Sequence, residues 1–323
     1  MIKFLKYFSL SKKLKKAGVL NMNYRNFAVI SANNSRRLYP LVDDKVKTKQ
    51  LATQHNIQTP RLIGVIKAQY EVKNLLKMVD GWQSFVIKPA HGSGGKGVLV
   101  IKKYTKNYFR TASERVLKYT EVYQHISNIL SGLYSLGGRY DEAILEEMVS
   151  FSDVFKGYSY QGVPDVRVIV YQGYPAIAMM RLATKESKGR ANLHQGAVGV
   201  GLDIQTGRAV AAVQHNKPIQ YHPDTGADLM TLEVPDWKTH LEIAAKGFDM
   251  TGLGYLGADI VLDKKMGPMV LELNARPGLA IQIANQRGLI SILKEIETYP
   301  KDLSYDKRVA FILQSAQKND PSF

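Results

Sequence analysis

The chain has 323 residues, of which 45% are hydrophobic and 22% charged, a composition typical of a soluble protein with about two domains. It contains no cysteine, which excludes disulfides, thiol nucleophiles and thiolate metal sites. It has no apolar run long enough to predict a membrane span, and its first residues lack the apolar stretch and cleavage site of a signal peptide, so we expect a cytoplasmic protein.

The formal net charge is +16, and the first 40 residues carry nine Lys or Arg side chains with no acidic residue among them. We call residues 1–43 the N-terminal arm. Such a segment predicts an anionic partner, such as phospholipid head groups at the inner membrane surface, RNA or an acidic protein. A solvated helix face would have the same composition and is the equally weighted alternative. The basic residues are Lys3, Lys6, Lys12, Lys13, Lys15, Lys16, Arg25, Arg36 and Arg37.

After the arm, Asp43 and Asp44 open a predicted helix that reaches about Leu51 and ends before Thr59-Pro60. Short apolar runs then predict strands over residues 63–66, 84–88 and 98–101. A glycine-rich loop separates the last two strands. We therefore expect a β-hairpin whose tip is this loop.

The loop residues Gly92, Ser93, Gly94, Gly95, Lys96 and Gly97 match the pattern G-x-G-x-x-G. A dinucleotide-binding fingerprint requires a helix directly after the glycines, whereas a β-branched apolar run follows here. The loop is better explained as a lid whose backbone N–H groups approach a polyphosphate, with Lys96 and Lys88 adding positive charge. A flexible surface hairpin is the alternative. The glycine spacing excludes a Walker A loop, and no His-Arg-Asp or Asp-Phe-Gly triplet supports a protein kinase.

Beyond the lid, Thr111 to Glu114 match a capping box, and apolar residues recur at helical spacing up to Leu133, which predicts a long helix ending near Gly137. Further apolar runs predict a strand over residues 143–149 and hairpins over 165–182 and 256–273. Strands mixed with helices indicate an α+β or α/β architecture.

The last hairpin brings acidic side chains together. If its turn is Lys264 to Gly267 and Asp263 faces Pro268, then Asp259 lies opposite Glu272. Asn274 shares their face. Two carboxylates so close repel each other unless a cation lies between them, and three oxygen-bearing side chains on rigid strands suit Mg²⁺ together with nucleotide phosphates. A solvated pair of carboxylates is the alternative.

Positive charge is expected near that site. Arg167 follows Asp165 on one strand, Arg181 ends its partner strand, and the polar loop 185–196 holds Asn192. Arginines near a magnesium polyphosphate would stabilise charge on a transferred phosphoryl group or a tetrahedral oxyanion. A structural ion-pair role is weighted equally for each arginine.

In this order the motifs resemble the ATP-grasp superfamily, specifically RimK-type peptide glutamate ligases and alpha-L-glutamate ligase-like proteins. The match spans roughly residues 43–290. It rests on Asp44-Lys45, Val86-Ile87-Lys88-Pro89 and the glycine loop, Leu145-Glu146-Glu147-Met148-Val149, Asp165-Val166-Arg167, Arg190-Ala191-Asn192, Gly257-Ala258-Asp259 and Leu271-Glu272-Leu273-Asn274-Ala275-Arg276.

The resemblance implies an ATP-grasp fold with two α+β subdomains, residues 44–145 and 146–298, that grip ATP, followed by a helical tail over 299–323. It places Lys45 and Lys88 on the phosphates and Asp153 near the ribose. It places adenine against the connector Glu146, Glu147, Met148 and Val149. It also implies that Asp259, Glu272 and Asn274 hold two Mg²⁺ ions, with Mn²⁺ as an alternative, and that Arg181 and Asn192 face an acyl phosphate.

The implied activity is amide formation between a carboxylate and an amine of amino acids, peptides or proteins, through an acyl phosphate. The sequence departs from the family pattern in four ways. The arm replaces a domain of about a hundred residues, and about ten extra residues, within 151–164, separate the connector from Asp165. Gln195 replaces a basic residue, and Arg276, which we include among the catalytic candidates, replaces a small polar one. Whether the substrate is glutamate therefore stays open. Two other functions also stay open: a nucleotide-binding module that its arm recruits, and another phosphoryl transferase.

Overall fold

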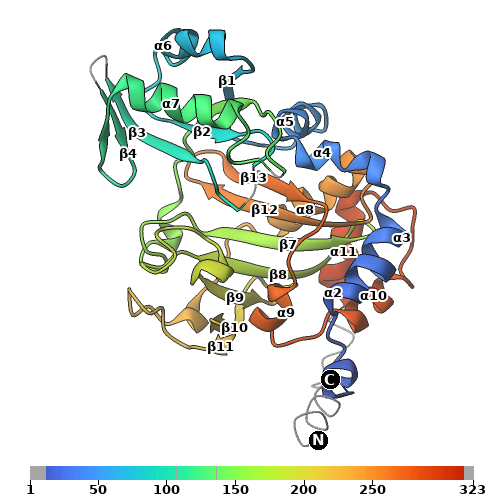
Figure 1. Cartoon of the computed structure of the whole chain (residues 1–323). Coiled ribbons are helices and arrows are strands. Elements are labelled where there is room, and N and C mark those ends of the chain that lie inside the picture. The colour runs from blue at the N-terminus through green and yellow to red at the C-terminus, as the bar shows by residue number, and fades with distance from the viewer. Residues whose placement is uncertain (1–11, 93, 106–107, 136, 316–323) are drawn as a thin grey trace, which may run out of the picture. The chain divides into compact units, whose positions relative to one another are not determined.

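The computed structural model describes residues 12–92, 94–105, 108–135 and 137–315 (Figure 1). The chain divides into two compact units, which we call the lid unit (residues 43–150) and the main unit (residues 1–42 and 151–323). No described helix is long and apolar enough to cross a membrane.

The lid unit contains a six-stranded antiparallel sheet with strand order β1-β6-β2-β3-β4-β5. A core of buried aliphatic and aromatic side chains, including Phe85, Phe109 and Ile126, joins the sheet to helix α7. The strands are β1 (Leu62–Ile66), β2 (Phe85–Pro89), β3 (Leu99–Thr105), β4 (Tyr108–Thr111), β5 (Val116–Leu117) and β6 (Ala143–Glu147). The helices are α5 (Lys45–Gln54), η3 (Gln69–Asn74), α6 (Leu75–Met78) and α7 (Tyr119–Leu130).

Two features of this unit confirm the sequence prediction and one corrects it. Helix α5 begins after Asp44, whose side chain accepts hydrogen bonds from Val46 N and Lys47 N. Strands β2 and β3 pair as the predicted hairpin. The predicted helix start at Thr111 is wrong, because Thr111 ends strand β4 and Glu114 has a left-handed φ of 63°. Helix α7 instead follows Lys118, and it ends at Leu130 rather than near Gly137.

The main unit contains a seven-stranded antiparallel sheet with strand order β11-β10-β9-β8-β7-β12-β13. Helices α8 and α11 pack together, α8 also contacts β7, β12 and β13, and α9 and α10 contact β8. The strands are β7 (Asp165–Tyr171), β8 (Tyr174–Leu182), β9 (Val198–Leu202), β10 (Ala209–Gln214), β11 (Lys217–Pro218), β12 (Tyr255–Asp263) and β13 (Gly267–Asn274). The longer helices are α8 (Trp237–Thr251), α9 (Ala280–Ala284), α10 (Ile290–Ile296) and α11 (Tyr305–Ser315).

Short helical segments complete the main unit. Four lie in the N-terminal arm or at its end: α2 (Met22–Tyr24), η1 (Arg25–Ile30), α3 (Ser31–Asn33) and η2 (Arg36–Leu38). Helix α4 (Pro40–Asp43) lies at the boundary between the units, and η4 (Asp153–Phe155), η5 (Leu193–Gln195) and η6 (Leu229–Thr231) lie in connecting loops.

Both predicted hairpins of the main unit are present, but the second has a different register near its turn. Asp263 faces Gly267, not Pro268. A β-bulge then shifts the register between Asp259 and Ile260, so that Asp259 lies opposite Glu272 after all. The predicted pairing of the two carboxylates is therefore confirmed, although the turn that was used to derive it is wrong.

Candidate functional site

The glycine loop is fixed at both of its ends. Lys45 Nζ donates to the carbonyl oxygen of Gly92 at 2.7 Å. A Cβ atom added at Gly92 would lie 2.2 Å from Pro89 Cγ, and one added at Gly97 would lie 2.6 Å from the Tyr134 ring, so glycine is required at both positions. Between them Gly94, Gly95 and Lys96 are exposed, whereas Ser93 lies outside the described residues. The tip is thus open to a ligand while its ends are held.

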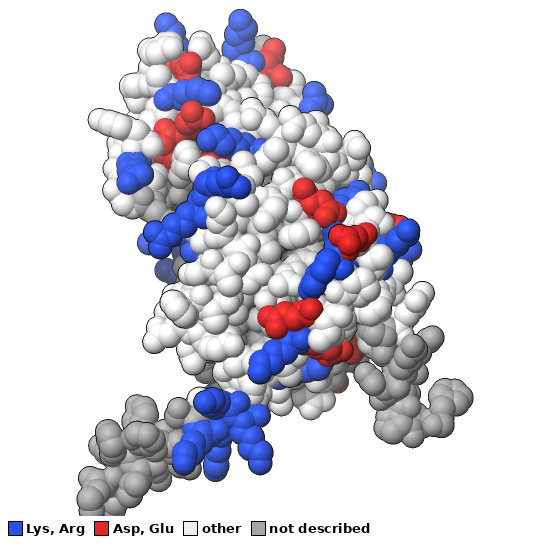
Figure 2. Space-filling view, turned by 90° about the vertical axis from the view of Figure 1, so that its right-hand side faces the viewer, with Lys and Arg blue, Asp and Glu red and all other residues white. Residues whose placement is uncertain are grey.

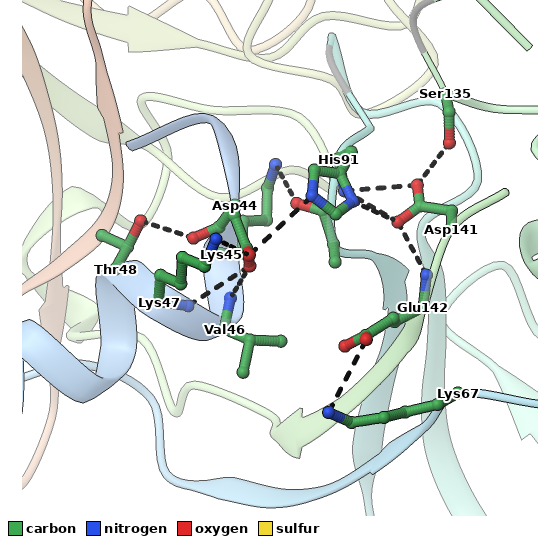
Figure 3. A network of polar contacts seen from close by, with 11 residues as sticks. Asp44, Lys45, Val46, Lys47, Thr48, Lys67, His91, Ser135, Asp141 and Glu142 are labelled. Atoms are coloured by element: carbon green, nitrogen blue, oxygen red, sulfur yellow. Dashed lines mark hydrogen bonds and ion pairs between the residues drawn. The ribbon is translucent and has the colours of Figure 1, made fainter. Parts of the chain in front are cut away.

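A buried carboxylate organises the N-terminal end of the loop (Figure 3). Asp141, whose side chain is fully buried, accepts hydrogen bonds from the His91 N–H at 3.1 and 3.2 Å, the Glu142 N–H at 2.8 Å and the Ser135 hydroxyl. Its Oδ1 lies 2.8 Å from His91 Nδ1. The other ring nitrogen of His91, Nε2, faces Asp44 Oδ2 at 3.9 Å. The histidine ring is therefore oriented by Asp141 at the base of the glycine loop, beside the beginning of helix α5.

Neither His91 nor Asp141 was predicted from the sequence as a site residue. His91 directly precedes the glycine loop, which was a usable signal. Asp141 is fifty positions further along the chain, and only the pairing of β2 with β6 brings it close.

A second buried carboxylate lies on strand β6, beside strand β2. Glu146 lies 2.5 Å from Lys88 Nζ through Oε1 and 2.9 Å from Lys49 Nζ through Oε2. Burial alone would raise the pKa of Glu146, but the two lysines outweigh it and hold the pKa below its ordinary value. Burial lowers the pKa of Lys49. Lys88, predicted to contact phosphate, is thus paired with Glu146 in this structure.

The other connector residues differ in exposure. Glu147 is exposed, Met148 is half-buried and Val149 is buried. The Glu147 N–H donates to the Arg61 carbonyl at 2.9 Å. The predicted adenine contacts at this connector stay a prediction.

In the main unit, charged side chains lie opposite one another on three neighbouring strands, two carboxylates followed by an arginine. Glu272 on β13 is paired with Asp259 on β12, and Asp259 with Arg167 on β7. Arg167 grips Asp259 with two hydrogen bonds, Nε to Oδ1 at 2.7 Å and NH2 to Oδ2 at 2.6 Å. Arg181 NH2 approaches Oδ2 of the same carboxylate at 2.8 Å, and its Nε donates to Asp165 Oδ1 at 2.5 Å.

The pKa values of Asp259 and Asp165 depend on their burial and on the arginines beside them. Burial opposes ionisation of Asp259, but Arg167 and Arg181 outweigh it, so the pKa of Asp259 lies below its ordinary value. Burial dominates at Asp165 and raises its pKa to about 6 despite the contact with Arg181. Both predicted arginines are therefore members of buried ion pairs, the alternative that the sequence left open.

The donor set at Asp259 fits a hard cation. A carboxylate offers about four lone pairs, and the two arginines occupy three of them on Asp259, which leaves one on Oδ1. Glu272 and Asn274 are half-buried beside it, and Asn274 Nδ2 lies 3.5 Å from Asp259 Oδ2. Within the described residues, no group of three His, Cys, Asp or Glu side chains is arranged to hold a metal ion. A magnesium site would therefore rest on two carboxylates and one amide, with phosphates and water completing it.

Three further candidates make other contacts. Asn192 Oδ1 caps the short helix η5 by accepting from the His194 N–H at 3.0 Å. Arg276 is exposed, and its guanidinium lies 4.9 Å from the centre of the Tyr39 ring. Asp153, predicted near the ribose, is exposed and paired with Lys264 Nζ at 2.6 Å. None of these contacts by itself assigns a role in catalysis.

The chain matches one family model and several known proteins. A family model described as "Sugar-transfer associated ATP-grasp" matches residues 24–298. The chain is 26% identical over 236 residues to a probable alpha-L-glutamate ligase of Aeromonas salmonicida, covering 73% of this chain and 57% of that protein. It is 25% identical over 253 residues to a protein of the same description from Vibrio cholerae, covering 78% and 62%. The chain thus spans less than two thirds of the length of these relatives.

Solved structures with a similar fold include D-alanyl-alanine synthetase A of Vibrio cholerae, with 10% identity, a TM-score of 0.45 and coverage of 87% of this chain and 66% of that chain. Another is the ATP-grasp ligase PsnB complexed with a minimal precursor, with 15% identity, a TM-score of 0.43 and coverage of 81% and 61%.

Proposed function

Because the chain belongs to the sugar-transfer associated ATP-grasp family, we propose that it is an ATP-dependent ligase that joins a carboxylate to an amine through an acyl phosphate. The observation that carries the proposal is the group in which Asp259 lies opposite Glu272 and beside Arg167. It combines oxygen donors for a cation with fixed positive charge on one sheet. Phosphoryl transfer needs both, and it needs no covalent nucleophile from the protein.

The chemistry follows from the weakness of a carboxylate as an electrophile. In the first step a carboxylate oxygen attacks the γ-phosphorus of ATP, the bond to the β,γ-bridging oxygen breaks, and ADP leaves. In the second step the amine attacks the acyl carbon, the bond from carbon to the phosphate oxygen breaks, and inorganic phosphate leaves while the amine loses a proton. Bound Mg²⁺ would supply charge neutralisation on the phosphates.

The chain's own residues would bind and orient the reactants. In the proposed arrangement the glycine loop and Lys96 cover the phosphates, Lys45 and Lys88 lie at the base of that loop, and the connector 146–149 holds adenine. Asp259, Glu272 and Asn274 would hold the metal, which we propose to be two Mg²⁺ ions. Arg181, Arg167, Asn192 and Arg276 are the proposed contacts to the acyl phosphate, and Asp153 is the proposed contact to the ribose.

The substrate class is proposed from the relatives. Two curated relatives are described as probable alpha-L-glutamate ligases, and the family description refers to sugar transfer. We therefore propose a carboxylate from an amino acid or peptide and an amine on an amino acid, peptide, protein or amino sugar. The need for ATP is consistent with the cytoplasm as its location.

The experiment is a hydroxylamine trap. The purified full-length chain is incubated with ATP, Mg²⁺ and a pool of amino acids, short peptides and amino sugars, and hydroxamates are identified by mass spectrometry. We expect an ATP-dependent hydroxamate that names the activated carboxylate. ADP release without any hydroxamate would contradict an acyl phosphate and favour another phosphoryl transferase.

A nucleotide-binding module with little catalysis is the second candidate. The observation that favours it is the engagement of both Arg167 and Arg181 by Asp165 and Asp259, which leaves their guanidinium groups less available to a substrate. Tight ATP binding with neither ADP release nor hydroxamate across the pool would support this candidate over the ligase.

A further inference from the structure

From residue 17 onward, the N-terminal arm packs against residues 282–290 of the same unit. The Leu20 N–H donates to Gln282 Oε1 at 2.8 Å, and Gln282 Nε2 donates back to the Leu20 carbonyl at 3.0 Å. The Ile290 N–H donates to the Gly18 carbonyl at 3.0 Å. A Cβ atom added at Gly288 would lie 2.2 Å from the Ala17 carbonyl oxygen, so the two segments are in close contact. The arm therefore has a defined attachment and is not merely tethered.

The described part of the arm presents positive charge without compensation. Residues 12–16 are helical and every one of them is exposed. They contain Lys12, Lys13, Lys15 and Lys16, and no acidic residue precedes Asp43. Figure 2 shows a group of Lys and Arg side chains with no acidic one among them at the lower edge of the molecule, the end at which Figure 1 draws this helix.

Large apolar side chains are exposed within the same stretch. Phe27 is 83% exposed, Met22 63%, Leu14 45% and Tyr24 44%, although Val29 and Ile30 of the same helical region are buried. Single exposed apolar side chains are common on protein surfaces, but here four lie within 14 residues of chain, next to four exposed lysines. A segment that exposes both kinds of side chain suits the boundary of a membrane. We call Lys12, Lys13, Leu14, Lys15, Lys16, Met22, Tyr24 and Phe27 the arm surface.

We propose that the arm surface docks the protein on an anionic phospholipid membrane. Lysines attract anionic head groups, while Leu14, Met22 and Phe27 can enter the boundary between head groups and acyl chains. This interpretation is favoured over RNA for two reasons. The charged residues of the arm surface are all lysines, whereas phosphate recognition on nucleic acids draws on the bidentate geometry of arginine. Leu14 and Met22, two of its four apolar residues, cannot stack on bases as Tyr24 and Phe27 can, but both can enter a membrane boundary. The proposal concerns location and does not depend on the proposed ligase activity.

The first test is flotation with vesicles of phosphatidylcholine, alone or with phosphatidylglycerol added, using the full chain without nucleotide. Each lysine near an anionic surface increases the partitioning of a protein onto that surface by about fivefold. Replacing Lys12, Lys13, Lys15 and Lys16 together by Gln should therefore weaken binding to the anionic vesicles by at least about tenfold. The matched control replaces four exposed lysines elsewhere, Lys73, Lys77, Lys217 and Lys307, by Gln, and should bind as the wild type does.

The second test asks whether the apolar side chains enter the membrane. Because the chain has no cysteine, Phe27→Cys creates one labelling site for an environment-sensitive fluorophore. Its emission should shift to shorter wavelength on addition of anionic vesicles but not on addition of inorganic phosphate. The control is Tyr70→Cys, a site that is 71% exposed in the lid unit, which should show no shift.

Three results would overturn the proposal: equal binding of the two four-lysine variants, an unshifted label at position 27, or salt-dependent binding to a single-stranded RNA with none to anionic vesicles. The last result would assign the arm surface to RNA. Because none of these measurements uses ATP or a substrate, failure of the membrane proposal leaves the hydroxylamine trap unaffected.

Discussion

Asp259 lies opposite Glu272 because strand β13 contains one extra residue, Leu271, at a β-bulge. Near the turn the pairing follows Asp263 with Gly267 and Ile260 with Val270. Continued without the bulge, that register would place Leu271 opposite Asp259 and turn Glu272 to the other face of the sheet. One inserted residue thus decides whether the two carboxylates can share a cation.

The first prediction concerns that pair. Glu272→Gln keeps the shape of the side chain but removes its charge, so it should weaken metal binding and lower kcat by at least about a hundredfold. The measurement is the rate of ADP release with each substrate pool as Mg²⁺ is titrated. Glu233→Gln, at an exposed glutamate paired with Arg208, is the matched control and should retain wild-type rates. Full activity in Glu272→Gln would refute the metal assignment.

The second prediction concerns the buried triad of Lys49, Glu146 and Lys88. Glu146→Gln leaves two buried lysines without their anion and should lower the free energy of unfolding by about 3–5 kcal/mol. Denaturant unfolding measures this loss. The neighbouring exposed Glu147→Gln should change stability by less than about 0.5 kcal/mol. Equal stability of the two variants would show that the triad does not hold the lid unit together.

Local patterns in the sequence were sufficient for much of the fold. Alternating apolar residues and the Gln172-Gly173 turn predicted the β7–β8 hairpin, and both turn residues have the left-handed φ that such a turn requires. The match of the family model confirms the ATP-grasp resemblance drawn from the ordered motifs. Each of these signals lies within a short stretch of chain, which is why it could be read without the tertiary structure.

The errors arose where strand pairing decides the local structure against the local pattern or propensity. The capping pattern from Thr111 to Glu114 suits a helix start, yet the Thr111 N–H bonds to the Arg115 carbonyl and strand pairing prevails. Strands β9 and β10 were not predicted, because their sequences are rich in glycine and alanine, which have low strand propensity. The pairing of Arg181 with Asp165 likewise depends on a register shift within the β7–β8 hairpin.

The third prediction concerns Asp141 as a positioning residue for the glycine loop. Asp141→Asn replaces an acceptor of several hydrogen bonds by a group that also donates, so the His91 ring and the base of the loop should lose their fixed orientation. We expect ATP affinity, measured by calorimetry, to fall by about tenfold, which corresponds to about 1.4 kcal/mol. Asp80→Asn, at an exposed site in the same unit, is the control. A loss of thermal stability with unchanged ATP affinity would reduce Asp141 to a purely structural role.

The fourth prediction concerns the dependence of stability on pH. His240 is buried in helix α8, its Nδ1 lies 3.1 Å from the Asp236 carbonyl oxygen, and burial lowers its pKa to about 4. An unfolded histidine has a pKa of about 6.5, so between these values the unfolded state binds a proton that the folded state does not. Stability should therefore be complete above about pH 6.5 and decrease as the pH falls, by about 3 kcal/mol at pH 4 from this residue alone.

The variant that isolates this contribution is His240→Leu, which fills the buried position with a side chain that does not titrate. Denaturant unfolding at a series of pH values should show a shallower loss of stability on acidification in His240→Leu than in the wild type, because one proton uptake by the unfolded state has been removed. His194→Gln changes an exposed histidine and should keep the wild-type slope. If His240→Leu and the wild type lose stability in parallel between pH 6.5 and 4, the neutral buried state of His240 is refuted, and acid sensitivity must come from the carboxylates paired with arginine and lysine.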